Sequence, residues 1–145
     1  MSTVPISAAL RRLVVERAQG HREYCLLPAE VAFFPHEVDD IVAVKHGGVS
    51  EPENLAFTCW RCNRHKGTDL ASLDPETAAL TPLFHPRRDR WADHFSLRGA
   101  TLVGVTPVGR TTVRLLQVNT LERMRERERL GPRLSARPLV EPPTE

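Results

Sequence analysis

The pattern of apolar positions predicts a short amphipathic helix near the start of the chain. Leu10, Val14 and Ala18 recur at helical spacing and form one apolar stripe within residues 7–18. Ser7 is a residue type that caps helix starts, and a glycine follows shortly after the last apolar position. We therefore expect a helix that packs one face against a core.

Two short apolar runs in the next part of the chain favour β-strands. Residues 36–44 are rich in β-branched side chains and end before the Gly47-Gly48 pair, and residues 54–58 form a second run. Residues 60–73 are typical of a turn that leads into a helix. This order of two strands and a helix, after an N-terminal helix, predicts an α+β fold.

The C-terminal part gives weaker patterns. Residues 74–98 are interrupted by prolines, and residues 100–119 mix strand and helix signals. Glu and Arg alternate over residues 120–130, which predicts a charged helix with a solvated face, and we expect the proline-containing end to be disordered. We thus expect one domain over residues 1–119, followed by a charged helix and a tail over residues 120–145.

Composition narrows the class of protein. The chain has 145 residues, of which 41% are hydrophobic and 26% are charged. This is enough for one modest core and too apolar for wholesale disorder. No run of about 18 apolar residues is present, so we expect no membrane span. The N-terminus lacks a basic-then-apolar signal pattern, which indicates a cytoplasmic protein.

The charges are unevenly distributed along the chain. Residues 1–60 carry 5 basic and 8 acidic residues, whereas residues 61–145 carry 15 basic and 10 acidic residues. Of the 20 basic residues, only Lys45 and Lys66 are lysine. The planar guanidinium of Arg matches the geometry of a phosphate, so the second half is the expected contact for a polyanion. The alternative is that these arginines cover an ordinary solvated surface.

Three cysteines indicate a metal site rather than a disulfide. Cys59 and Cys62 form a Cys-x-x-Cys turn, and Cys25 supplies a third thiol from a distant loop. Zinc needs a fourth ligand, but Arg22 stands three residues before Cys25 and cannot ligate a metal. His21 lies one residue further back and can reach the site. The residues therefore predict a structural zinc ion held by these three thiolates and His21; the alternative is that Cys25 is a buried apolar filler.

The order of motifs from residue 38 to residue 67 resembles the HNH endonuclease family. The chain reads Val-Asp-Asp-Ile-Val at 38–42, Lys-His-Gly-Gly at 45–48, Glu-Asn-Leu-Ala at 53–56 and Cys-Trp-Arg-Cys-Asn-Arg-His-Lys-Gly at 59–67. The similarity continues through residues 83–95 and 104–119. It implies a ββα-metal core within residues 21–67, with zinc-stapled loops, an N-terminal helix and a helical or irregular C-terminal extension.

The resemblance implies a divalent metal ion that serves phosphodiester hydrolysis. The family's metal ligands fall on Asp39 and Asn63, with Mg²⁺ or Mn²⁺ as the expected ion, and the Asn that orients the general base falls on Asn54. The position of the general-base His is occupied by Asp40. A carboxylate with a reference pKa of about 3.9 is a weaker base than an imidazole with one of about 6.5. Asp40 then either replaces the base or binds the metal.

Three other histidines lie close to this motif in sequence. His36 is expected about 13 Å along the strand from Asp40, and His65 on a helix face nearly opposite Asn63. His46 precedes the glycine pair in a loop that can swing toward the site. Each of the three is also compatible with an ordinary surface or loop position. Adjacent strand residues point to opposite faces, so Asp39 and Asp40 share a site only if the strand twists, bulges or ends there.

The basic residues near the motif complete the functional prediction. We expect nucleic acid, specifically DNA, to be held by six cations: Arg61, Arg64, Lys66, Arg87, Arg88 and Arg90. We expect Trp91 and Phe95 to pack in a core. The leading function is an HNH-type endonuclease. The alternatives are a catalytically impaired homologue that binds DNA or regulates, and a zinc-stapled protein-interaction domain.

Overall fold

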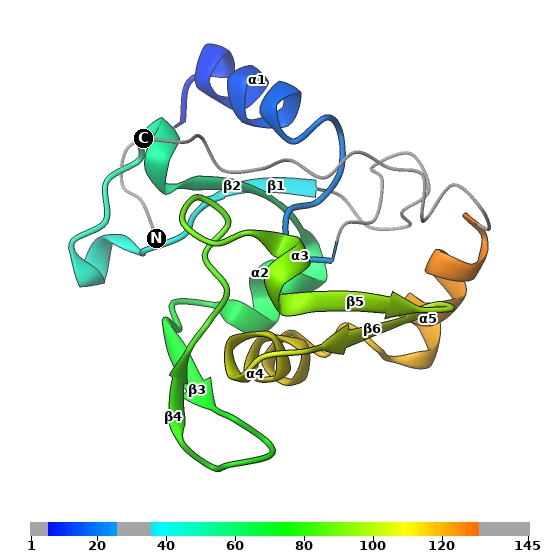
Figure 1. The fold of residues 1–145 in the computed structure, drawn as a ribbon. Helices are drawn as coiled ribbons and strands as arrows, with labels where there is room; N and C mark the ends of the chain where they lie inside the picture. Colours follow the sequence, from blue (N-terminus) through cyan, green and yellow to red (C-terminus); the bar gives the residue numbers. More distant parts are fainter. Residues whose placement is uncertain (1–5, 26–35, 131–145) are drawn as a thin grey trace.

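The structure is a computed structural model that describes residues 6–25 and 36–130 (Figure 1). The tail expected to be disordered lies outside the described residues, as do residues 26–35. The described chain mixes helices with three small two-stranded antiparallel sheets, which confirms the α+β class.

The predicted N-terminal helix is present as α1 (Ala8–Arg17). The Ser7 hydroxyl accepts a hydrogen bond from the Leu10 amide at 3.1 Å and so caps the helix start. Val14 and Ala18 are fully buried and pack with Leu55 and Phe57 into a small core cluster. The apolar stripe therefore faces the protein, as its spacing predicts.

Strands β1 (His36–Asp40) and β2 (Leu55–Cys59) form an antiparallel pair in which Asp40 lies opposite Leu55. Strand β1 is shorter than the predicted 36–44 run, because the chain bends after Asp40 and continues into two 3₁₀ turns, η2 (Val44–His46) and η3 (Pro52–Asn54). Every residue of β2 is buried, since the strand is covered on both faces.

Helix α2 (Trp60–Lys66) follows β2 without a loop. The Cys59 thiol caps it by accepting a hydrogen bond from the Cys62 amide at 3.2 Å. The prediction of a helix reaching residue 73 was wrong: α2 ends before Gly67, whose φ of 51° an L side chain rarely adopts. Its place is taken by β3 (Ala71–Leu73), which pairs with β4 (Leu80–Pro82).

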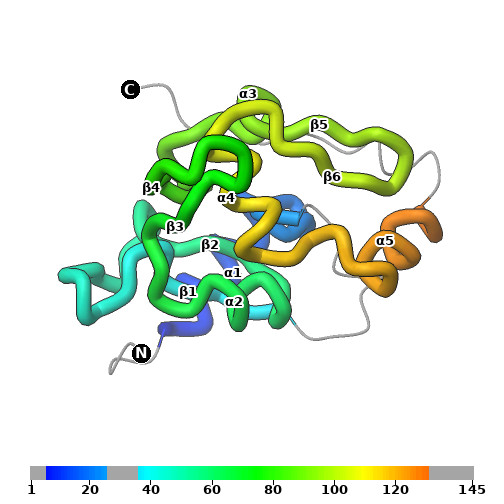
Figure 2. Tube along the Cα trace, turned by 90° about the horizontal axis from the view of Figure 1, so that it is seen from below, coloured from blue at the N-terminus to red at the C-terminus, as the bar shows by residue number. Residues whose placement is uncertain are grey.

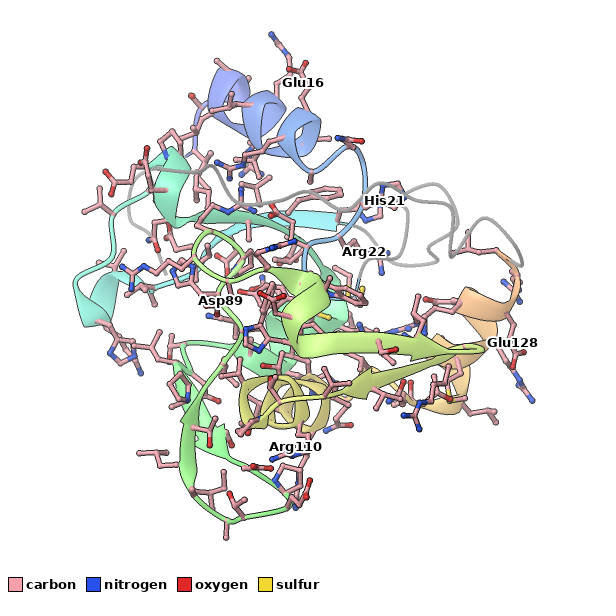
Figure 3. All side chains as sticks on the ribbon, in the orientation of Figure 1. Glu16, His21, Arg22, Asp89, Arg110 and Glu128 are labelled. Atoms are coloured by element: carbon pink, nitrogen blue, oxygen red, sulfur yellow. The ribbon has the colours of Figure 1, made fainter. Side chains whose placement is uncertain are left out.

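The C-terminal half adds four elements that the sequence patterns did not resolve. These are α3 (Trp91–His94), β5 (Phe95–Arg98), β6 (Thr101–Gly104) and α4 (Pro107–Leu116). Figures 1 and 2 show α1 on one side of the β1–β2 pair and α2 on the other, with α4 and the β5–β6 hairpin beyond α2. The β3–β4 hairpin projects from this body, and Arg110 of α4 holds its Asp74 through two hydrogen bonds (Figure 3).

The charged helix predicted over residues 120–130 is present as α5 (Leu121–Glu128). The helix has the expected exposed face, but Arg123, Glu126 and Arg127 on its other side are buried. Arg127 donates hydrogen bonds to three oxygen atoms, those of Ala100 and Val118 among them. Glu–Arg alternation alone did not reveal that these charges have internal partners. The predicted division of the chain at residue 119 stays a prediction.

A close approach between α4 and its neighbours gives a test of the packing. A Cβ atom on Gly109 would lie 2.0 Å from the His94 carbonyl oxygen. We expect Gly109→Ala to lower the free energy of unfolding by about 1–3 kcal/mol, because the backbones must separate. In an exposed helix the same change stabilises by up to about 1 kcal/mol. Chemical denaturation measures the sign, and a more stable variant would contradict the close approach.

Candidate functional site

Three of the four predicted catalytic-site residues line one pocket. Asp39, Asp40 and Asn63 surround a cavity of about 320 Å³. The remaining lining residues come from the bend after β1 and from the end of α2: Ala43, Val44, Gly67 and Thr68. The structure thus brings together two carboxylates and an amide from elements that the β1–β2 register and the β2–α2 junction place side by side.

The end of β1 explains how two adjacent residues reach the same pocket. Asp40 is the last residue of the strand, and the backbone bends at the next position. The alternation of side chains between faces therefore stops there. The Asp40 side chain is buried, and its Oδ1 accepts a hydrogen bond from the Ser50 hydroxyl at 3.0 Å.

The pocket is acidic. Burial raises the pKa of Asp39, and the neighbouring carboxylates of Asp40 and Glu37 raise it further, while the Asp40 amide and Lys66 oppose the rise. Burial lowers the pKa of Lys66, against the attraction of these carboxylates. The Lys66 ammonium is buried and donates to the Ile41 carbonyl at 2.7 Å. Lys66 therefore lies under the pocket as a structural cation and is not exposed to a ligand.

The donor atoms fit a hard divalent cation. Asn63 donates from Nδ2 to the Glu37 carboxylate, so its amide oxygen is the atom suited to a metal. Two carboxylates and an amide oxygen match the oxygen ligands that Mg²⁺ and Mn²⁺ prefer. The residues present are thus compatible with the ion that the motif implies.

Asn54 has a different set of contacts from the one predicted. Its Oδ1 accepts from the Val42 amide at 2.9 Å, and its Nδ2 donates to the carbonyls of Val42 and Val49 at 2.9 and 3.0 Å. These bonds use the side chain to hold the loop that follows β1. Orientation of a base by Asn54 stays a prediction, because the bonds described for its amide are all to backbone.

The three nearby histidines occupy different places. The Nδ1 atom of His36 accepts from the Arg22 guanidinium, and its ring lies 5.3 Å from that of Phe57. His65 is exposed on α2, and partial burial lowers its pKa. His46 lies 3.1 Å through Nε2 from the carbonyl of Thr68, a residue that lines the pocket. His46 therefore contacts a residue of the pocket wall.

The predicted thiol cluster is present. The Sγ atoms of Cys25, Cys59 and Cys62 all lie within 4.8 Å of one another, and all three residues are buried. The segment after α1 that carries Cys25 is held against β2, because Glu23 exchanges two hydrogen bonds with Phe57. This pairing places Cys25 next to the β2–α2 junction, so the three thiols could hold a metal ion.

The structure does not bring His21 into this group. The His21 Nδ1 atom lies 3.0 Å from the Gln19 carbonyl oxygen, and His21 is not among the metal-ligating side chains grouped at the thiols. Arg22, which stands three residues before Cys25 and cannot ligate a metal, is buried. His21 as a fourth ligand stays a prediction that this conformation does not support.

Arg123 is a residue of the thiol cluster that the sequence patterns missed. Its Nη2 atom donates to Cys62 Sγ at 2.8 Å and to Cys59 Sγ at 3.3 Å. Hydrogen bonds within the cluster lower the pKa of the Cys25 thiol, and Arg123 lowers it further. Burial disfavours the charge on Arg123, but attraction to the thiols outweighs it and raises its pKa. No signal in the sequence links this position of a Glu/Arg-rich helix to the cysteines.

The predicted nucleic-acid contacts differ in accessibility. Arg61 forms ion pairs with Glu122 and Glu126 of α5, and Arg87 forms one with Glu23. Burial lowers the pKa of Arg87 to about 10. The exposed members of the predicted set are Arg64, Arg88 and Arg90. Trp91 packs against the core as predicted, with its indole donating to the Tyr24 carbonyl at 3.1 Å.

Comparison with known proteins agrees with this geometry. Residues 23–69 match the HNH endonuclease family, a segment that contains β1, β2, α2 and all three cysteines. No curated protein and no solved structure matches the chain. The chain therefore carries an HNH endonuclease domain, which indicates a nuclease or nucleic-acid-related function in a metal-dependent family. Within the described residues, no helix has both the length and the apolar character needed to cross a bilayer.

The contacts of Asn54 generate a prediction about stability. Asn54→Ala removes three hydrogen bonds from a buried side chain to the partly buried loop after β1, and each such bond contributes about 0.5–1.5 kcal/mol. We expect the free energy of unfolding to fall by at least 2 kcal/mol, measured by denaturant titration. Asn63→Ala is the matched control, because that amide has a carboxylate partner at the pocket. Equal small losses in both variants would contradict the loop-holding role.

Proposed function

We propose that this protein is an HNH-type endonuclease that hydrolyses phosphodiester bonds of nucleic acid, DNA in particular, with Mg²⁺ or Mn²⁺. The observation that carries the proposal is the pocket in which Asp39, Asp40 and Asn63 converge within the matched domain. Its oxygen donors are those of a hard-cation site, in a cavity of about 320 Å³. The exposed guanidiniums of Arg64, Arg88 and Arg90 supply phosphate contacts.

Each pocket residue has a distinct role in this proposal. Asp39 and the Asn63 amide oxygen hold the cation, and Asn63 is positioned by its hydrogen bond to Glu37. When bound, the cation supplies positive charge to the phosphate and the leaving oxygen. Asp40, oriented by the Ser50 hydroxyl, accepts a proton from the attacking water. Asn54 acts through the backbone, by fixing the loop whose residues form the pocket wall.

A specific observation favours a second candidate, an HNH homologue that binds nucleic acid with little or no cleavage. The base position holds Asp40 rather than His, and this carboxylate is buried beside Asp39 and bonded to Ser50. An additional negative charge there disfavours a phosphate unless a cation offsets it. General-base catalysis contributes about 10²–10⁴-fold to rate, so a weak base costs much of the activity.

We also propose that the thiol cluster binds a structural zinc ion. Three buried thiols from two segments converge at Cys25, Cys59 and Cys62, and thiolates are the preferred donors for Zn²⁺. An ion there would link the loop at Cys25 to the β2–α2 junction. This role is separate from the acidic pocket, since the two sites share no side chain.

The acidic pocket predicts that a divalent cation stabilises the fold. Burial raises the pKa of Asp39, so its ionised form is less favourable in the folded than in the unfolded chain, and stability falls as pH rises through that pKa. We expect Asp39→Asn to raise the melting temperature at neutral pH without cation. We also expect it to abolish the stabilisation by Mn²⁺, which is about 2.7 kcal/mol for wild type at 100 Kd. Calorimetry measures both effects.

The exposed Asp93→Asn on α3 is the control for this measurement. It removes the same charge outside the pocket and should leave the Mn²⁺ effect unchanged. Equal Mn²⁺ stabilisation of wild type and Asp39→Asn would show that the pocket does not hold the cation.

Cleavage of plasmid DNA tests the reaction. We expect wild type to nick plasmid only with Mg²⁺ or Mn²⁺, and Asp40→His to nick about 10²–10⁴-fold faster because an imidazole is the better base near neutral pH. Asp40→Asn removes both charge and proton acceptor and should be silent. A His46→Ala variant controls for an imidazole acting from the pocket rim. Gel assays of initial rates compare the four proteins.

The outcomes separate the two candidates. A silent wild type with an active Asp40→His variant would establish the impaired homologue. If both are silent, DNA binding at increasing salt decides whether the protein acts on nucleic acid at all. Phosphate contacts release counterions, so specific nucleic-acid binding must weaken as salt rises.

A further inference from the structure

The thiol cluster contains a buried cation from a distant helix. Arg123 of α5 is only 3% exposed, and its Nη2 atom bridges Cys62 Sγ at 2.8 Å and Cys59 Sγ at 3.3 Å. Its Nη1 atom donates to the Leu116 carbonyl at 2.8 Å, which fixes the plane of the guanidinium. Burying a guanidinium is costly unless hydrogen bonds and opposite charge accompany it, and thiolates bound to a metal ion at Cys59 and Cys62 would supply that charge.

Besides the hydrogen bonds of Arg127, helix α5 is held by this contact and by a pair of carboxylates. Thr120 caps the helix, with its hydroxyl accepting from the Arg123 amide. Glu122 and Glu126 hold Arg61 of α2 at 2.8 and 3.0 Å. Arg61 precedes Cys62 in α2. Helix α5 therefore contacts this short helix twice, through its two carboxylates at Arg61 and through Arg123 at the Cys62 thiol.

The number of cysteines gives this arrangement a charge argument. A Zn²⁺ ion with four thiolates carries a net charge of −2, whereas one with three thiolates carries −1. One guanidinium donating to the sulfurs neutralises the second case. Arg22, at the position of the missing ligand, cannot ligate, and its Nε donates to His36 on β1. The chain has no fourth cysteine for the cluster, and Arg123 supplies an N–H donor to the sulfurs of the three that it has.

We propose that Cys25, Cys59 and Cys62 form a three-thiolate zinc site completed by Arg123, which donates to the sulfurs as a positioning residue. The inference rests on the zinc site proposed above and is independent of phosphodiester cleavage. Because Arg123 belongs to α5, zinc binding and docking of α5 stabilise each other by the same factor. Among the described residues, no fourth metal-ligating side chain joins the three thiols, and the inference does not require His21.

Zinc affinity tests the role of Arg123. Removal of a group that hydrogen-bonds to metal ligands typically weakens metal binding about 10–100-fold. We expect this loss for Arg123→Gln in a competition titration against a chromogenic chelator. Arg123→Lys keeps the charge but not the bridging fork, so it should recover part of the affinity. Arg125→Gln, exposed on the same helix, is the matched control and should bind zinc like wild type, as should His21→Ala.

Cobalt substitution gives a readout that a purely structural role would not change. The sulfur-to-Co²⁺ charge-transfer bands of wild type should correspond to three thiolates and shift in Arg123→Gln, because the N–H···S bonds alter the sulfur electrons. The same bands should be unchanged in Arg125→Gln and His21→Ala. If Arg123→Gln does not fold, the Arg123→Lys variant provides both the affinity and the spectrum.

The possible failures are distinguishable. A reduced wild-type protein that binds no zinc overturns both the zinc site and the role of Arg123. Zinc binding of equal affinity in wild type and Arg123→Gln overturns the role of Arg123 alone. A nitrogen ligand in the cobalt spectrum that disappears in His21→Ala overturns the three-thiolate site.

Discussion

The antiparallel pairing of β1 with β2 determines where every group of the matched domain lies. The register places Asp40 opposite Leu55 and His36 opposite Cys59. A slip of one residue would exchange the two faces of β2, and both faces are buried, so the core specifies the register strongly. The acidic pocket forms at one end of this pair, where β1 stops. The thiol cluster forms at the other end, where β2 passes directly into α2.

The two ends of the hairpin are held by different interactions. At the Asp40 end, backbone pairing between Ile41 and Asn54 is extended by the Asn54 amide, which closes the loop after β1. At the Cys59 end, the loop carrying Cys25 is bonded to Phe57, and α5 contacts the thiols through Arg123. The pocket is thus built from nearby segments, whereas the thiol cluster joins segments about a hundred residues apart in sequence.

The local part of this arrangement follows from the sequence, and the distant part does not. The order of strand, strand and helix, the Asp39–Asn63 pair and the three thiols were predictable, because each depends on short-range patterning or on a recognisable motif. The length of β1 was not, since the bend after Asp40 depends on three bonds from Asn54. The burial of one face of α5 was not predictable either, because the sequence does not distinguish an Arg that contacts a thiol from an Arg that is exposed to water. The same holds for the positive charge of residues 61–145, since charge counts do not show which arginines form ion pairs within the protein. Arg61, Arg87 and Arg110 are each paired with a carboxylate of the same chain.

The two sites differ in the charge that the protein itself supplies. At the thiol cluster, Arg123 donates to sulfur and brings positive charge. At the pocket, Asp40 adds a carboxylate beside Asp39, and the nearby Lys66 is committed to the Ile41 carbonyl. The unbalanced charge of the acidic pocket can therefore be relieved only by protonation or by a cation from solution. Hydrolysis, where it occurs, requires that this cation leave enough positive charge for a phosphate after two carboxylates are satisfied. That requirement, rather than the strength of the base alone, is what Asp40 imposes on the reaction.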